Sequence, residues 1–348
     1  MTHEAVPAFE VKDVTKVFHL GGALFKSSIV AVNNARFVVG GGGKPEIFTL
    51  AGESGSGKTT LAKIALGMEQ PTEGEILEGG QNLVGIRRRK DRMTFMKKVQ
   101  PIFQNPFETF SPLKPVRSYL FETAKAFEVG ATDEERERVI EESLELVGLS
   151  LEALGKKYPN EFSGGQLQRT SIARALIPSP EILVADEPVS MVDASIRMSI
   201  VNLFKKLRDE RGVNVLYITH DLATAYYASD RIAIMLRGNI VESGTVEDVL
   251  DNPKHPYTQL LLESIPEPDP HQVWEEDIAL ATFEEKEFGQ EGCKFAGRCP
   301  FVMDICKRAD PPPRFTENRS VKCYLYEDEG GATETRDTAS AGSDATPS

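Results

Sequence analysis

The stretch Gly52-Glu53-Ser54-Gly55-Ser56-Gly57-Lys58-Thr59-Thr60 decides how the rest of the sequence is interpreted. It fits the pattern G-x-x-x-x-G-K-[ST], which is typical of a loop that cradles phosphate groups. Gly55 and Gly57 let the backbone curl tightly and turn its N–H groups toward an anion. Lys58 adds an ammonium group that can reach the β- and γ-phosphates of a nucleotide, and Thr59 offers a hydroxyl to Mg²⁺. All residues from 52 to 60 are therefore candidates for nucleotide contact.

The segments on either side of this loop agree with that interpretation. Residues 48–51 are apolar enough to form a buried strand, and residues 61–68 have the pattern of a helix. Phosphates held by the loop would then lie at a helix N-terminus, where unpaired N–H groups and the helix dipole favour anions.

Composition limits the functions that the chain can have. With 348 residues there is room for two or three domains, and 53 acidic against 40 basic residues give a formal net charge of −13. This balance argues against a broad nucleic-acid surface, and we interpret the basic stretch 86–98 as a solvated helix face. The N-terminus lacks a signal-peptide pattern, and no apolar run approaches the roughly 18 residues that span a bilayer. We therefore expect a soluble, cytoplasmic chain whose membrane role would need a partner chain.

Strand and helix patterns alternate along the chain, which predicts an α/β fold with a mainly parallel sheet covered on both faces. Residues 8–18 read as a strand and 29–39 as two short strands around a turn at Asn33-Asn34, which gives an antiparallel β subdomain. Helical patterns at 116–128 and 132–148 interrupt the alternation. They predict an inserted α-helical subdomain at about residues 107–178.

A phosphate loop needs an acidic residue on a second strand for the metal ion. Asp186 ends the apolar run 182–185 and is the candidate ligand for Mg²⁺, directly or through water. Glu187 follows at the exit of the strand, where a carboxylate could orient an attacking water. The alternative interpretation is a simple turn at the end of the strand, before Pro188.

A second glycine-rich motif, Ser163-Gly164-Gly165-Gln166, stands before a helical run. Consecutive glycines at a helix start expose N–H groups and form a second anion-binding nest. One phosphate loop with two nests makes sense if the second nest faces the nucleotide of another subunit.

The segment 162–176 that contains this motif resembles the signature segment of ATP-binding-cassette ATPases. The resemblance covers residues 8–250 and keeps the motif order of the family, with Gln104 as the Q-loop residue, 190–193 as the D-loop and His220 as the switch histidine. It implies a RecA-like P-loop NTPase core in which two subunits close head to tail around two ATP molecules. It also implies that Gln104 serves Mg²⁺, that His220 senses the γ-phosphate, that Asp193 lies at the shared site and that Phe18 stacks on adenine. An ordinary core phenylalanine is the alternative for Phe18.

A finer resemblance links residues 254–262, 264–270 and 292–301, with the loop 21–25 and the tract 104–107, to the ATPases of peptide and nickel importers, and to the second of their two ATPase subunits. It implies a nucleotide-binding domain at 1–265 and a cysteine-containing extension at 266–326. Residues 327–348 are rich in Glu, Gly, Ala, Ser and Thr, and this composition predicts a disordered tail. The implied partners are a second ATPase subunit in a heterodimer or homodimer, two transmembrane permease subunits and, indirectly, an extracytoplasmic solute-binding protein. No nucleic-acid partner is implied, and the chain would sit peripherally on the cytoplasmic face of the membrane.

The implied function is ATP hydrolysis that powers import of dipeptides or oligopeptides. Oligosaccharide or nickel remains an alternative solute. A soluble cassette ATPase acting on nucleic acid or ribosomes is a different class of protein. Such proteins usually carry tandem cassettes or a long coiled-coil insertion, and the sequence has neither.

The four cysteines, Cys293, Cys299, Cys306 and Cys323, are confined to the extension. Four thiols could hold a [4Fe–4S] cluster or Zn²⁺. A shared metal would require any helix between Cys299 and Cys306 to end or bend, since an unbroken one would hold these residues roughly 10 Å apart. In the resembling family this segment holds an iron–sulfur cluster in some members. The alternatives are free thiols or disulfides, the latter disfavoured in a reducing compartment.

Overall fold

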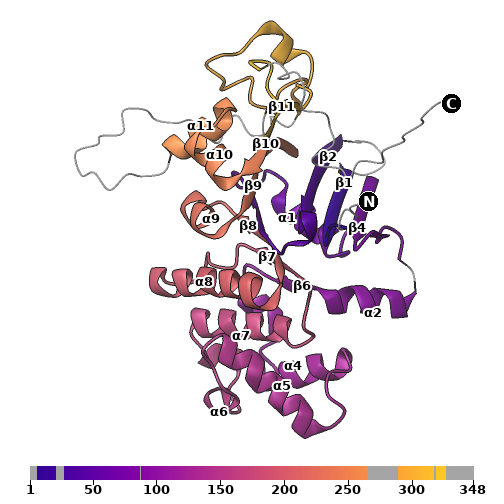
Figure 1. Ribbon diagram of the computed structural model, residues 1–348, viewed down its shortest axis with the longest axis vertical. Helices are drawn as coiled ribbons and strands as arrows, with labels where there is room; N and C mark the ends of the chain where they lie inside the picture. The colour runs from indigo at the N-terminus through magenta and orange to yellow at the C-terminus, as the bar shows by residue number, and fades with distance from the viewer. Residues whose placement is uncertain (1–5, 21–26, 87, 265–288, 317–318, 327–348) are drawn as a thin grey trace, which may run out of the picture.

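The computed structural model describes residues 6–20, 27–86, 88–264, 289–316 and 319–326 (Figure 1). The loop 21–25, residues 265–270 of the resembling segment and the tail predicted at 327–348 lie outside the described residues. The boundary that we expected at residues 265–266, between the nucleotide-binding domain and the extension, also lies outside the described residues.

Among the described residues, an eight-stranded sheet with the order β11-β12-β10-β9-β3-β8-β7-β6 forms the centre of the molecule. Its core strands pair in parallel, as predicted. They are β3 (Ile47–Ala51), β6 (Val99–Ile102), β7 (Ile182–Asp186), β8 (Asn214–Thr219) and β9 (Arg231–Leu236). Because β8 lies between β3 and β7, the carboxyl ends of these three strands meet at one edge of the sheet. The other strands are antiparallel additions, namely β10 (Asn239–Thr245), β11 (Arg314–Thr316) and β12 (Arg319–Val321).

Both faces of this sheet are buried. Along β8, Val215 and Tyr217 join one apolar cluster, whereas Leu216 and Ile218 join another. This alternation is the period-two pattern of a strand covered on both sides. The helices near the sheet include α1 (Lys58–Ala65), α2 (Arg89–Lys98), α8 (Ala194–Arg211), α9 (Leu222–Ala228), α10 (Val246–Asp251) and α11 (Pro256–Glu263).

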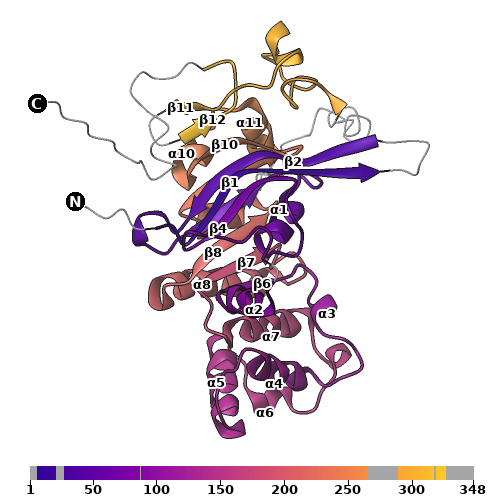
Figure 2. The ribbon, with the colours of Figure 1, turned by 90° about the vertical axis from the view of Figure 1, so that its right-hand side faces the viewer.

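A second, antiparallel sheet has the order β2-β1-β4-β5, which confirms the β subdomain. Its strands are β1 (Phe9–Leu20), β2 (Ser27–Val39), β4 (Glu73–Glu78) and β5 (Gln81–Asn82). Figure 2 shows β1 and β2 as long strands that project beyond the rest of the molecule. The stacked rings of Phe37 and Phe48, with centroids 4.8 Å apart, join this sheet to the central one.

The prediction of two short strands around Asn33-Asn34 is wrong, because β2 runs through both asparagines. Asn34 has a φ of 47°, and the register of β1 against β2 shifts beside it. Its N–H donates a hydrogen bond to the hydroxyl oxygen of Thr15 on the neighbouring strand. Pairing with β1 on both sides of the irregularity therefore turns an expected turn into a bulge.

The inserted helical subdomain is present and lies below the sheet in Figure 1. Its helices are α3 (Pro106–Thr109), α4 (Val116–Ala126), α5 (Asp133–Leu146), α6 (Leu151–Leu154) and α7 (Gly164–Leu176). Thr132 and Glu135 form a capping box at the start of α5, the helix that the pattern at 132–148 predicted.

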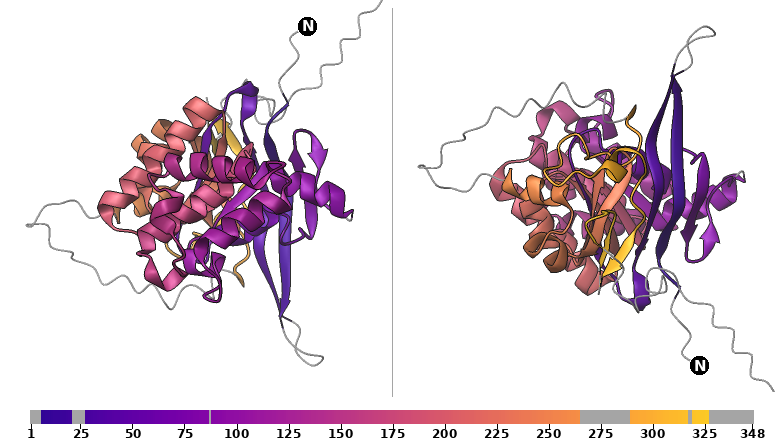
Figure 3. Two further views of the ribbon diagram at one scale, coloured as in Figure 1. Left: turned by 90° about the horizontal axis from the view of Figure 1, so that it is seen from below. Right: turned by 90° about the horizontal axis from the view of Figure 1, so that it is seen from above.

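The described part of the extension lies at the opposite end of the molecule, over α10 and α11 (Figures 1 and 3). Its strand β12 pairs with β10, so the extension continues the central sheet. Residues 304–307 form a single 3-10 turn, and no continuous helix joins Cys299 to Cys306. Within the described residues, no helix is both long and apolar enough to cross a membrane.

Candidate nucleotide-binding site

The phosphate loop joins the end of β3 to the start of α1, as its flanking patterns predicted. Gly52 and Gly57 have φ values of 149° and 106°, a region that favours glycine. A Cβ atom would lie 2.1 Å from the carbonyl oxygen of Met235 at Gly52, and 2.2 Å from that of Ala31 at Gly57. Both positions therefore require glycine for space as well as for conformation.

Helix α1 begins at Lys58, three residues earlier than predicted (61 − 58), because Gly57 is its N-cap. Its first intrahelical bond runs from the N–H of Leu61 to the carbonyl of Gly57. The N–H groups of Lys58, Thr59 and Thr60 precede that bond and so lack intrahelical acceptors. They are available to an anion in the loop.

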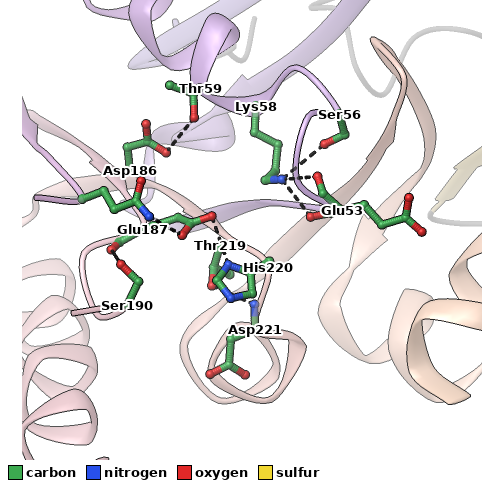
Figure 4. A network of polar contacts seen from close by, with 12 residues as sticks. Glu53, Ser56, Lys58, Thr59, Asp186, Glu187, Ser190, Thr219, His220 and Asp221 are labelled. Carbon is green, nitrogen blue, oxygen red and sulfur yellow. Dashed lines mark hydrogen bonds and ion pairs between the residues drawn. The ribbon is translucent and has the colours of Figure 1, made fainter. Parts of the chain in front are cut away.

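Lys58 lies at the centre of the loop and is almost fully buried. Its Nζ donates to the carbonyl oxygens of Gly52 (2.8 Å) and Glu53 (2.7 Å) and to the hydroxyl of Ser56 (3.3 Å; Figure 4). Burial lowers the pKa of Lys58, and the nearby carboxylates of Glu187 and Asp186 oppose this shift. Its ammonium group is thus held inside the loop, at the place where phosphate oxygens would compete for it.

Asp186 ends β7 opposite the start of α1 and accepts a hydrogen bond from the hydroxyl of Thr59, at 3.4 Å. Burial raises the pKa of Asp186, while the Thr59 hydrogen bond lowers it. A hydroxyl and a carboxylate side by side are oxygen ligands of the kind that Mg²⁺ prefers. The structure therefore brings together two of the three residues predicted to serve the metal.

The third, Gln104, lies with Glu187 and His220 in one cluster. Figure 4 shows Glu187 and His220 side by side. The side-chain amide of Gln104 donates to Oε2 of Glu187 at 3.0 Å, and Nδ1 of His220 lies 3.0 Å from Oε1 of Glu187. Glu187 adopts a φ of 45°, which is uncommon outside glycine and is found at functional sites. The three predicted catalytic side chains thus meet although they come from distant parts of the sequence.

A cavity of about 930 Å³ connects the loop with this cluster. Its volume lies at the upper end of the roughly 300–1,000 Å³ that ligand pockets enclose. The predicted residues that line it are Gly52, Glu53, Ser54, Gly55, Gly57, Lys58, Thr59, Thr60, Gln104, Glu187 and His220.

Sequence reasoning missed other residues of the cavity wall. They are Ile29, Ala31, Arg197, Asp221, Leu222, Leu261 and Ser264. Asp221 caps α9 and forms an ion pair with Arg197 of α8 at 3.2 Å. Its position directly after His220 was the available signal, whereas nothing in the sequence pattern marked Arg197.

Other predicted residues lie away from the cavity. Phe18 is on β1 opposite Ile29, and Ile29 is the one of the pair that lines the wall. Asp193 is the N-cap of α8. Neither Phe18 nor Asp193 lines the cavity, and their predicted roles at the nucleotide stay predictions.

The motif Ser163-Gly164-Gly165-Gln166 forms the N-terminus of α7, which begins at Gly164 and not at Leu167. Ser163 and Gln166 exchange hydrogen bonds as a capping box and are exposed. Gly165 packs so closely on α8 that a Cβ there would lie 2.6 Å from Cδ1 of Ile196. The motif is therefore rigid and accessible, and it is separate from the phosphate loop of its own chain.

The four cysteines are free, and all of them line one small cavity of about 10 Å³ in the extension. Burial is the main cause that raises the pKa of Cys293 to about 11, and the other three thiols contribute. Within the described residues, no group of three or more His, Cys, Asp or Glu side chains is arranged to hold a metal ion.

His255 lines the same cavity, and burial lowers its pKa to about 4. Its Nδ1 accepts the N–H of Tyr257, so the neutral ring carries its proton on Nε2. Nε2 has no hydrogen-bond partner among the described residues. A buried N–H donor without an acceptor is uncommon and would suit an acceptor bound in the cavity.

Comparison with known families gives two matches. Residues 42–190 match the family model described as ABC transporter, and residues 241–306 match that of the oligopeptide/dipeptide transporter C-terminal region. Among curated proteins, the chain is 39% identical to the putative oligopeptide transport ATP-binding protein YkfD of Bacillus subtilis, over 92% of this chain and 96% of that protein. It is 42% identical to the oligopeptide transport ATP-binding protein OppF of Streptococcus pyogenes, over 75% of this chain and 82% of OppF.

Solved structures give a similar result. The dimeric ATP-binding cassette MJ0796, in a post-hydrolysis state with ADP and Pi, superimposes with a TM-score of 0.61 and 28% identity, over 68% of this chain and 98% of that one. The protein cbiO1 of Clostridium perfringens superimposes with a TM-score of 0.59 at 22% identity, a likeness of fold alone.

Proposed function

Since this chain belongs to the ABC transporter family, as an ATP-binding subunit with the C-terminal region of oligopeptide/dipeptide transporters, we propose that it hydrolyses ATP to power the import of oligopeptides. The observation that carries the proposal is the cluster of Gln104, Glu187 and His220 across the cavity from Lys58. It places a carboxylate where it can take a proton from water beside a phosphate-binding loop.

The predicted residues in and beside the cavity have tasks that their positions suit. Lys58 and the first amides of α1 hold the β- and γ-phosphates of ATP, and Thr59, Gln104 and Asp186 are placed to hold Mg²⁺. When bound, Mg²⁺ neutralises charge on the phosphates. Glu187 orients the attacking water and accepts its proton.

His220 and Gln104 hold the two oxygens of Glu187 in place, which fixes the direction of the carboxylate. Because these two residues also line the cavity, a bound γ-phosphate would alter their contacts. This arrangement supports a role for His220 and Gln104 in sensing whether ATP is bound.

The active form is proposed to contain two such ATPase chains, either two copies or this chain with a related one. The exposed motif at 163–166 supports this arrangement, because its helix N-terminus is free to meet the ATP held by a partner's phosphate loop. Asp193, at the start of the neighbouring helix, would lie at the same junction. The cassette MJ0796, whose solved structure is a dimer, is a precedent for the pairing of two chains of this fold.

Two transmembrane permease subunits, fed by an extracytoplasmic solute-binding protein, would complete the importer and hold this chain peripherally at the cytoplasmic face of the membrane. Two exposed apolar side chains after Gln104 are the proposed contact with the permease. Phe107 is 46% exposed and Leu113 is 84% exposed. Such side chains are unfavourable in water and suit a protein interface.

The solute can be tested by uptake in a strain that lacks this chain. We expect uptake of a radiolabelled tripeptide to be lost, and to be restored by the wild-type gene but not by a Glu187→Gln variant. Uptake of a free amino acid is the control and should not change. Normal tripeptide uptake together with loss of oligosaccharide or nickel uptake would move the proposal to that solute.

For the four cysteines we propose that their cavity binds a [4Fe–4S] cluster, with Zn²⁺ or free thiols as the alternatives. The convergence of all four on one cavity and the unpartnered Nε2 of His255 support this. The thiols do not form a ligand group as they stand, so they would have to rearrange and lose their protons on binding. No step of ATP hydrolysis depends on this site.

Anaerobic purification followed by iron, acid-labile sulfide and zinc assays distinguishes these alternatives. We expect a brown protein with about four irons and four sulfides per chain. A Cys299→Ser variant should lose most of both. A colourless, metal-free protein in which all four thiols react with a thiol reagent after denaturation would contradict the cluster.

A further inference from the structure

Arg298 links the cysteine-bearing extension to the phosphate loop. Arg298 lies between Cys293 and Cys299 in the sequence, and its guanidinium group forms an ion pair with Glu53 in the loop. Nη1 donates to Oε1 at 3.0 Å and Nη2 to Oε2 at 3.3 Å. Two parallel bonds between a guanidinium and a carboxylate fix direction as well as distance.

This ion pair is largely shielded from water. The side chain of Arg298 is 13% exposed and that of Glu53 is 24% exposed. The guanidinium carbon lies 5.2 Å from the ring centroid of Phe295 and 5.9 Å from that of Tyr257. Screening by solvent is therefore weaker here than for an ion pair on the surface.

Glu53 is also held by its backbone. Its N–H donates to the phenol oxygen of Tyr257 at 3.0 Å, and its carbonyl oxygen accepts from Lys58. Tyr257 belongs to α11 and is fully buried. The start of the loop is thus fixed by α11 through the main chain and by the extension through the side chain.

The charge of Glu53 gives these contacts a consequence for nucleotide binding. A carboxylate in a phosphate loop would repel the polyphosphate of ATP if it were free to turn toward the cavity. In Figure 4 the carboxylate of Glu53 points away from Lys58. Arg298 holds it in that direction, and Arg237 adds a second positive charge 3.8 Å from Oε2.

We propose that Arg298 is a positioning residue for the phosphate loop, and that the extension sets the affinity for ATP by holding and neutralising Glu53. This rests on the proposed binding of ATP at the loop. Arg298 does not line the cavity, and it acts through Glu53, which does.

The test is ATP binding and hydrolysis by full-length variants in the presence of Mg²⁺. An Arg298→Ala variant should bind ATP about tenfold more weakly, since Glu53 loses both charged hydrogen bonds and keeps only the more distant Arg237 as a positive neighbour. Its kcat at saturating ATP should stay within about twofold, because the contacts of Glu187 are unchanged. An Arg308→Ala variant is the matched control, since Arg308 is an exposed arginine of the same extension, and its Kd should not change.

A second substitution separates charge from folding. Glu53→Gln removes the carboxylate that Arg298 neutralises, so the double variant Glu53→Gln/Arg298→Ala should bind ATP more tightly than Arg298→Ala alone. A merely structural role for Arg298 would give no such recovery. Arg298→Lys, which keeps the charge without the two parallel bonds, should lie between the wild type and Arg298→Ala.

Failure of the proposed function and failure of the role of Arg298 give different experimental results. A wild-type chain that neither binds nor hydrolyses ATP, alone or with a related ATPase chain, overturns the proposed function and this inference with it. Wild-type activity with an unchanged Kd for ATP in Arg298→Ala overturns only the role of Arg298. Equal weakening of the single and double variants overturns it as well.

Discussion

Replacing Glu187 with glutamine is expected to lower kcat for ATP hydrolysis by at least about a hundredfold, which is the smaller end of what a general base contributes. Glutamine has the same size and keeps a carbonyl oxygen to meet His220, so the cavity should retain its shape. It cannot accept a proton from water. The measurement is phosphate release at saturating Mg²⁺ and ATP.

The same variant should bind ATP at least as tightly as the wild type. Glu187 places negative charge near Lys58, as its effect on the pKa of Lys58 indicates, and removing that charge reduces repulsion of the phosphates. If ATP lies between two chains, blocked hydrolysis should also let a dimer accumulate. Size-exclusion chromatography with ATP measures this, with ADP as the comparison.

Glu210→Gln is the matched control, because Glu210 is an exposed glutamate on α8 and lines no part of the described cavity. Its kcat should equal that of the wild type. Phosphate release at the wild-type rate by Glu187→Gln would remove Glu187 from the role of base and would point to another group beside the cavity.

The sequence predicted the functional site most accurately where the residues concerned are neighbours in the chain. The phosphate loop needs glycine, lysine and threonine at fixed spacing, so residues 52–60 could be assigned from the pattern alone. The strand before the loop and the helix after it were also recognisable. Helix α1 nevertheless starts three residues earlier than its apolar pattern indicated, since the loop itself supplies the N-cap at Gly57.

The spacing of residues in the sequence could not show that groups far apart in the chain lie together in the fold. Gln104 is 83 residues from Glu187, and His220 is 33 residues from it. Their convergence follows from the parallel order β8-β7-β6, since His220, Glu187 and Gln104 follow the carboxyl ends of these strands, and it was expected only through the resemblance to a family. The turn expected at Asn33-Asn34 failed for a related reason, since long-range pairing with β1 overrides the local preference of asparagine.

The ion pair between Glu53 and Arg298, which are 245 residues apart, is another contact at the site that sequence spacing could not predict. A glutamate within a phosphate loop and an arginine between two cysteines each have ordinary local explanations. The addition of β12 to β10 and the packing of Phe295 against Tyr257 hold the extension beside α11 and the start of the loop. No periodicity in the sequence encodes this contact.

Replacing Lys58 with alanine is expected to weaken ATP binding by roughly a hundredfold, because two charged hydrogen bonds to phosphate are lost. In the structure the same ammonium group donates to the carbonyl oxygens of Gly52 and Glu53. The substitution therefore also leaves two inward-facing carbonyl oxygens without their donor. Their partial negative charge would then repel the phosphates.

The measurement is isothermal titration of the variant with ATP, in the presence and absence of Mg²⁺. Lys63→Ala is the matched control, since Lys63 is an exposed lysine in the last turn of the same helix, and its Kd should stay within about twofold. Thermal unfolding without nucleotide separates a damaged loop from a damaged fold. Lys58→Ala with a wild-type melting temperature and a wild-type Kd would show that phosphate is held by the backbone amides alone. Lys58 would then serve only to shape the loop.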